Sequence, residues 1–131
     1  MKIVKWITIV AGVIVLIAAG VFLSLKDLDD SAREGAPGSF IMLSEGNVRY
    51  QRHGPSSGDV TVLVHGFSTP SFVWRGVVPR LTAAGLRVLS YDLYGRGWSD
   101  RPSVAYDTEL FDRQLVELLA SQNITRPINL V

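Results

Sequence analysis

Apolar and polar positions form separate blocks along this chain, and the first block predicts a membrane anchor. Ile7–Leu25 contains no charged residue. At about 1.5 Å per helical residue this segment reaches about 28 Å, which is close to the thickness of the hydrocarbon core of a bilayer. The pattern therefore predicts that residues 1–25 form a single transmembrane helix.

Charges on the two sides of this segment predict its orientation. Lysines precede it, whereas three aspartates, Asp27, Asp29 and Asp30, follow it. The positive-inside rule then places the N-terminus in the cytoplasm and the rest of this single-pass membrane protein outside the cytoplasm. A cleaved signal peptide and a buried core helix stay open as alternatives. Ala18 and Gly20 would suit cleavage, but the apolar run exceeds the roughly 7 to 15 residues usual in signal peptides.

The next block is polar and precedes a predicted domain. Lys26–Ser39 is rich in Gly, Pro and Ser and has no periodicity, which predicts a flexible linker over residues 26–39. The domain then covers residues 40–131. Phe40–Leu43 and Val48–Arg52 are short strand-like runs, and the turn-type residues Glu45–Asn47 between them predict an antiparallel hairpin.

The remaining blocks alternate between strand and helix patterns. Val60–Val64, Arg87–Tyr91 and Ile128–Val131 are apolar and rich in β-branched residues, as interior parallel strands are. Phe72–Ala84 has helical spacing, with Gly76 and Pro79 interrupting its start. A second helix follows Asp107, its predicted cap, and its apolar stripe consists of Phe111, Leu115, Leu118 and Leu119. A hairpin followed by alternating strands and helices predicts an α/β fold with a mostly parallel sheet.

Composition excludes several functions. The 131 residues carry a net charge of +1 and no cysteine. Such a balanced charge does not favour nucleic-acid binding, and without cysteine neither disulfides nor thiolate zinc sites can form. No motif with metal-ligand spacing and no phosphate-binding loop is present, so we expect neither a metal nor a cofactor.

One motif carries chemistry. His65-Gly66-Phe67 follows the predicted strand Val60–Val64 and precedes a helix. Here the sequence resembles the α/β-hydrolase family, in which this loop supplies a backbone N–H of the oxyanion hole. The resemblance implies that Phe67 N–H stabilises the developing negative oxygen and that His65, Gly66 and Ser68 contribute to substrate binding. We expect Gly66 to allow a tight turn, and His65 to brace the loop.

A second motif supports the same resemblance. Tyr91–Asp100, YDLYGRGWSD, is similar to the D-x-x-G-x-G-x-S stretch after the next strand of that family. We expect its role to be architectural, with Asp92 and Ser99 bonding to loop backbone and the glycines adopting positive φ. The other histidine, His53, is predicted to lie in a loop and to be exposed to solvent.

The nucleophile expected from the resemblance follows the strand at which this sequence stops. In the family, G-x-S-x-G comes after the equivalent of Ile128–Val131, and the acid and histidine of the triad come later. Ser68 and Ser99 are poor candidates because neither has the second glycine of that motif. We therefore expect an N-terminal fragment, inactive by itself, of a membrane-anchored serine esterase or lipase similar to monoacylglycerol lipases. Its substrate would be a small-molecule or lipid ester, and its oligomeric state stays open.

Three alternatives remain to be compared with this interpretation. An epoxide hydrolase or dehalogenase would use aspartate as the nucleophile, although epoxide hydrolases usually have proline where this sequence has Ser68. A non-catalytic, membrane-tethered binding module would keep the loop without the triad. A dinucleotide-binding oxidoreductase would need G-x-G-x-x-G after its first parallel strand, where this sequence has a single glycine.

Overall fold

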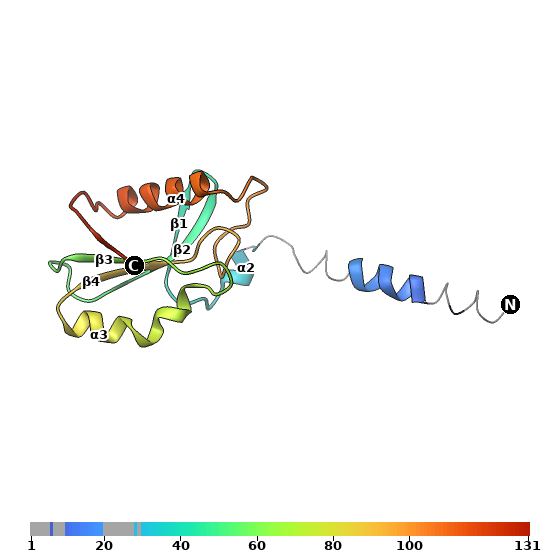
Figure 1. Ribbon diagram of the computed structural model, residues 1–131, viewed down its shortest axis with the longest axis horizontal. Coiled ribbons are helices and arrows are strands. Elements are labelled where there is room, and N and C mark those ends of the chain that lie inside the picture. Colours follow the sequence, from blue (N-terminus) through green and yellow to red (C-terminus); the bar gives the residue numbers. More distant parts are fainter. Residues whose placement is uncertain (1–5, 7–9, 20–27, 29) are drawn as a thin grey trace.

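The computed structural model describes residues 6, 10–19, 28 and 30–131. Residues 10–19 are helical (Figure 1, blue). Most of the predicted anchor, and residues 26, 27 and 29 of the linker, lie outside the described residues, so the anchor stays a prediction. Among the helices that the structure does describe, none combines the length and the apolar character needed to cross a bilayer.

The domain is built on a five-stranded mixed sheet. Its strands are β1 (Ser39–Leu43), β2 (Gly46–His53), β3 (Val60–Leu63), β4 (Arg87–Tyr91) and β5 (Asn129–Leu130), and their order in the sheet is β1-β2-β4-β3-β5. β2 pairs antiparallel with both β1 and β4, whereas β3 pairs parallel with both β4 and β5. The predicted hairpin and parallel strands are therefore confirmed.

The hairpin turn is tighter than the sequence predicts. Leu43 is paired with Gly46, so the turn consists of Ser44 and Glu45, and Gly46 and Asn47 already belong to β2. Contacts with a distant loop explain the difference. Asn47 N–H donates to the Asp100 carboxylate at 2.6 Å, and the Asn47 carbonyl accepts from Asp100 N–H at 2.8 Å. These bonds extend β2 beyond the point indicated by local turn preferences.

Helices cover both faces of the sheet, with α3 and α4 on opposite sides (Figure 1). The helix predicted over residues 72–84 consists of two pieces, the 3-10 helix η1 (Ser71–Gly76) and the α-helix α3 (Val78–Ala83). Proline in the first turn of α3 fixes its start, because proline lacks the N–H that a continuous helix would need there. The interruption predicted from Gly76 and Pro79 is thus confirmed.

The second predicted helix is α4 (Thr108–Ser121). The Asp107 side chain caps it by accepting from Leu110 N–H at 2.9 Å, as predicted. Buried Leu110 and Leu118 join the core formed by the sheet strands. The predicted stripe residues Phe111, Leu115 and Leu119 are partly buried against that core, so α4 covers one face of the sheet.

A short helix lies within the linker, where the sequence shows no periodicity. This helix, α2 (Asp30–Arg33), and the residues after it make contacts that join the linker to the domain. Arg33 pairs with Asp100, and its guanidinium lies 5.5 Å from the centre of the Phe40 ring. The Pro37 carbonyl accepts from Arg49 Nε at 2.6 Å. A helix of four residues is too short to leave a recognisable hydrophobic pattern, which explains why sequence analysis missed it.

Candidate active-site loop

The His65-Gly66-Phe67 loop begins directly after β3, and His65 links it to the loop after β4. His65 is 3% exposed. Its Nε2 accepts from Leu93 N–H at 2.9 Å, and its Nδ1 lies 2.8 Å from the Gly66 carbonyl oxygen. Because Nε2 is an acceptor, the neutral ring carries its proton on Nδ1 and donates it to Gly66. Both ring nitrogens are thus bonded to backbone, in agreement with the predicted bracing role.

Phe67 is the most exposed of the large apolar side chains in the domain, at 86%. Its carbonyl oxygen accepts from Arg96 Nε at 2.6 Å, and the Arg96 guanidinium lies 4.6 Å from the centre of its ring. Among the residues that the structure describes, Phe67 N–H donates to no other group. This donor is therefore available to a ligand oxygen, as the predicted role in an oxyanion hole requires.

Gly66 does not adopt the positive φ that favours glycine. Its φ lies outside the region adopted by seven other glycines among the described residues. A Cβ at this position would meet no atom within 4 Å. Gly66 therefore supplies no positive φ to this loop, and no close contact requires glycine here. What Gly66 provides instead is open space beside the Phe67 N–H. Ser68 is also exposed, and its hydroxyl lies 3.5 Å from the Thr69 hydroxyl.

The loop after β4 is held by Asp92, which is 1% exposed. Its carboxylate accepts from Ser71 N–H at 2.9 Å and from Trp98 N–H at 3.0 Å, so it joins the start of η1 to this loop. Its carbonyl accepts from the Ser99 hydroxyl at 2.6 Å and from the Gln114 amide at 3.1 Å. The architectural role predicted for Asp92 and Ser99 is confirmed.

Sequence analysis missed two residues of this network, Gln114 and Arg49. Gln114 lies on the buried side of α4, and its side-chain oxygen accepts from Tyr94 N–H at 3.1 Å. Arg49 is 4% exposed in β2; its Nη1 lies 3.9 Å from Asp92 and donates to the Ser71 hydroxyl at 2.6 Å. A glutamine in an amphipathic helix and an arginine in a strand both resemble ordinary surface residues in sequence, so neither gave a signal.

Burial also changes the protonation of groups near the loop. Burial lowers the pKa of Arg49, and the neighbouring Asp92 carboxylate opposes this effect. Burial raises the pKa of Tyr94 to about 12 and raises the pKa of Tyr91 as well. Both phenols are therefore neutral at physiological pH. Tyr94 uses its hydroxyl to donate to the Gly46 carbonyl at 3.3 Å, which connects the loop after β4 to the start of β2.

The remaining candidate residues do not form a catalytic group. Ser99 is fully buried, and its hydroxyl both accepts from Arg49 N–H and donates to Asp92. His53 is a half-buried residue at the end of β2, paired with Val88, so its prediction as an exposed loop residue is wrong. Within the described part of the chain, no histidine is hydrogen-bonded to a serine hydroxyl, and no cluster of ligands suited to a metal ion occurs.

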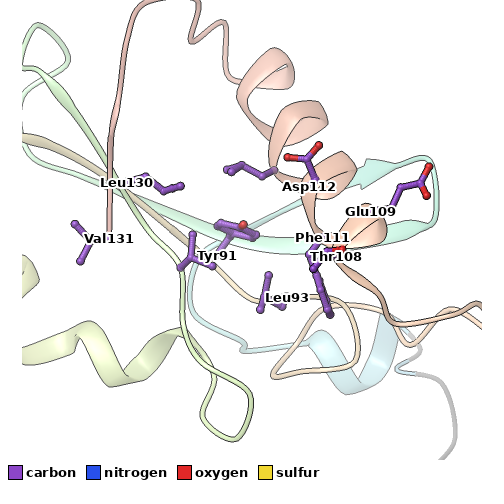
Figure 2. A pocket seen from close by; sticks show the side chains of 10 residues that line it. Tyr91, Leu93, Thr108, Glu109, Phe111, Asp112, Leu130 and Val131 are labelled. Carbon is purple, nitrogen blue, oxygen red and sulfur yellow. The ribbon is translucent and has the colours of Figure 1, made fainter.

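An open, largely apolar groove of about 960 Å³ lies between α4 and the edge strand β5. Figure 2 shows the side chains that line it. The apolar ones are Val64, Tyr91, Leu93, Phe111, Leu115, Leu130 and Val131, and the first turns of α4 add Thr108, Glu109 and Asp112. Val64 N–H also donates to the Val131 carbonyl at 2.7 Å, so the start of the His65-Gly66-Phe67 loop borders this groove.

Comparison with known proteins identifies a family match and several similar hydrolases. Residues 61–131 match the model of the alpha/beta hydrolase family. A haloalkane dehalogenase of Mycobacterium marinum is 45% identical over 56 residues, 43% of this chain and 19% of that protein. Epoxide hydrolase A of Mycobacterium tuberculosis is 34% identical over 97 residues, 72% of this chain and 30% of that protein. The solved esterase of Exiguobacterium antarcticum is 26% identical with a TM-score of 0.64, covering 71% of this chain and 34% of its own.

Proposed function

Because this chain belongs to the alpha/beta hydrolase family, we propose that it provides the oxyanion-binding loop of a hydrolase, with Phe67 N–H as one donor. The observation that carries the proposal is a backbone N–H without a partner among the described residues, located directly after β3 on a loop that His65 braces. The chain spans less than a third of the two curated relatives described above. The activity is therefore proposed for the enzyme that contains this chain.

The proposed chemistry requires a donor with a fixed position. When a nucleophile attacks an ester carbonyl, the oxygen becomes negatively charged, and an N–H that is already aimed at it stabilises the charge without reorganisation. Loss of one such donor typically lowers kcat by about 10² to 10³. Exposed Gly66 leaves space next to this donor, so a substrate atom can approach the backbone closely. The nucleophile itself would come from outside the described residues.

The substrate class favoured by the relatives is a haloalkane or an epoxide. The dehalogenase is 45% identical to this chain over 56 residues, and the epoxide hydrolase is 34% identical over 97 residues. For such substrates, an aspartate nucleophile would form an ester with the substrate carbon, either displacing halide or opening the epoxide while the ring oxygen takes up a proton from an acid outside the described residues. Water then hydrolyses that ester through a tetrahedral oxyanion, and Phe67 N–H would act in this second step.

A carboxylic ester is the second candidate substrate, as in lipases similar to monoacylglycerol lipase. Ser68 favours it, because epoxide hydrolases usually have proline at this position. The structural likeness to an esterase also supports it. In this case a serine would be the nucleophile, and Phe67 N–H would act during both acylation and deacylation.

The experiment that tests these proposals begins with the coding sequence. We would read the gene beyond the codon for Val131, express its complete product, and assay a 1-haloalkane, an epoxide and a p-nitrophenyl ester. An aspartate in the motif after β5, with dehalogenation or epoxide opening, would support the first candidate, and a serine with ester hydrolysis the second. The 131-residue chain is the control and should be inactive. A folded product without activity on any class would indicate a binding module instead.

We also propose that residues 1–25 anchor the protein in a membrane, with the domain outside the cytoplasm. The uncharged segment Ile7–Leu25 and the aspartates after it support this orientation. Alkaline carbonate extraction of membranes should leave the protein in the pellet, and protease added to intact cells or spheroplasts should digest the domain. A shorter, carbonate-soluble product would indicate a cleaved signal peptide.

A further inference from the structure

Arg96 joins the two loops of the candidate site through a single side chain. It lies in the loop after β4, between Gly95 and Gly97, whose φ values of 76° and 52° are accessible mainly to glycine. Its Nε donates to the Phe67 carbonyl at 2.6 Å, and its guanidinium lies 4.6 Å from the centre of the Phe67 ring. Its Nη1 also donates to the Gly95 carbonyl at 3.0 Å, which orients the guanidinium plane.

These contacts fix the position of Phe67, which burial in the core does not fix. Phe67 is 86% exposed, so packing in the core cannot fix its backbone or its ring. His65 anchors the preceding part of the loop, and Ser71 anchors the following part through Asp92. Between these two points, Arg96 provides the polar and ring contacts of Phe67 that the structure records. Arginine suits this task because its planar guanidinium can stack on a ring and donate a hydrogen bond at the same time.

Holding Phe67 on these two sides also fixes its N–H. The ring, the carbonyl and the N–H of one residue all radiate from the same Cα. Because His65 anchors the chain before Phe67, holding the ring and the carbonyl beyond the N–Cα bond restricts the φ angle of Phe67 and, with it, the direction of its N–H. We propose that Arg96 is a positioning residue that aims Phe67 N–H at the oxyanion. This inference rests on the proposed function of the Phe67 N–H, and it assigns Arg96 no contact with the substrate.

The test measures the order of the Phe67 N–H directly. The complete gene product would be labelled with ¹⁵N-phenylalanine, and the NMR order parameter of the Phe67 amide compared between the wild type, R96M, R96K and R113M. Arg113 is the matched control, because it lies on the exposed side of α4 and pairs with Glu45 of the hairpin turn rather than with Phe67. We expect an order parameter near about 0.85 in the wild type and R113M, below about 0.6 in R96M, and between these values in R96K. An unchanged value in R96M would overturn the proposal.

Kinetics then test whether this order matters for the reaction. On the substrate identified for the complete product, we expect R96M to lower kcat at least about tenfold, because the N–H acts mainly in the transition state. KM should change less than about twofold, and R96K should recover part of kcat. A disordered Phe67 N–H with an unchanged kcat would overturn the positioning role. If the wild type hydrolyses nothing, the proposed function fails separately, and the order parameter alone decides whether Arg96 holds Phe67.

Discussion

Two glycines in neighbouring loops have different physical reasons to be glycine. Gly97 has a φ of 52°, and a Cβ there would collide with the Asp92 carboxylate. Gly66 has neither constraint, since its φ is not positive and a Cβ would meet no atom within 4 Å. A glycine fixed by backbone conformation should be sensitive to any substitution, whereas a glycine that only leaves space should matter when a ligand occupies that space.

The first prediction follows from this contrast. Gly97→Ala should lower the free energy of unfolding by about 1–3 kcal/mol, since it strains the backbone and displaces the carboxylate that holds Ser71 and Trp98. Gly66→Ala should change it by less than about 0.5 kcal/mol. Urea denaturation of both variants provides the measurement. Equal destabilisation by the two substitutions would contradict this account of the loops.

Tyr94 gives a second residue-scale prediction, on pH dependence. Burial raises its pKa to about 12, compared with about 10 in an unfolded chain. The unfolded state therefore loses its phenolic proton first, and the contribution of Tyr94 to stability is complete below pH 10 and disappears as pH rises towards 12. Chemical denaturation between about pH 9 and about pH 12 should show this loss, because this range contains both the unfolded and the folded pKa of Tyr94. Tyr94→Phe should reduce the slope, and Tyr50→Phe is the control. An identical slope in wild type and Tyr94→Phe would refute the assignment.

At the scale of elements, local chemistry predicted the helices better than it predicted their limits. The Asp107 cap and the interruption after Gly76 were both evident because each depends on a specific residue type at a specific place. The start of β2 was not evident, since it depends on bonds from Asn47 to Asp100, far away in sequence. The helix α2 was missed for a related reason: Arg33 reaches the same Asp100, and such a contact leaves no periodic pattern in the chain.

The residues of the candidate site also differ in whether the sequence could predict their roles. The loop after β3 and the supporting role of Asp92 were predictable because motifs mark them. Arg96 and Arg49 were not, because their importance comes from which atoms they reach in the fold, Phe67 in one case and Ser71 in the other. Gly66 differs from both, because the general rule that glycine allows tight turns singled it out, whereas its φ is not positive and no close contact requires glycine there.

The α4 cap leads to a prediction at this scale. Asp107→Ala removes the acceptor of Leu110 N–H, so it should lower the free energy of unfolding by about 0.5–2 kcal/mol. Because α4 covers one sheet face and carries Gln114, the change should also loosen the loop that Gln114 holds at Tyr94. Asp112→Ala, on the exposed side of α4, is the control and should have little effect. Thermal unfolding followed by circular dichroism would compare them, and equal effects would contradict the capping role.

For the molecule as a whole, the two edges of the sheet differ in a way that should govern association. At one edge, β5 has two residues, and Leu130 and Val131 are each 57% exposed beside the largely apolar groove of about 960 Å³. At the other edge, β1 pairs with β2 over its whole length, and Met42 is a single exposed apolar side chain. An edge strand whose exposed apolar side chains adjoin an apolar groove favours contact with other chains, whereas a single exposed apolar residue does not.

We therefore expect the 131-residue chain to self-associate at micromolar concentration through the β5 edge and its groove. Val131→Asp should reduce the apparent mass measured by analytical ultracentrifugation, because Glu109 and Asp112 also line the groove and a further carboxylate would have to be desolvated beside like charges for a second chain to dock. Met42→Asp introduces the same charge at the opposite edge and should leave the mass unchanged. Both variants retain the apolar N-terminal segment, so a difference between them reports the groove alone. A monomeric wild type with a sharp melting transition, or equal effects of the two aspartates, would show that the β5 edge does not drive association.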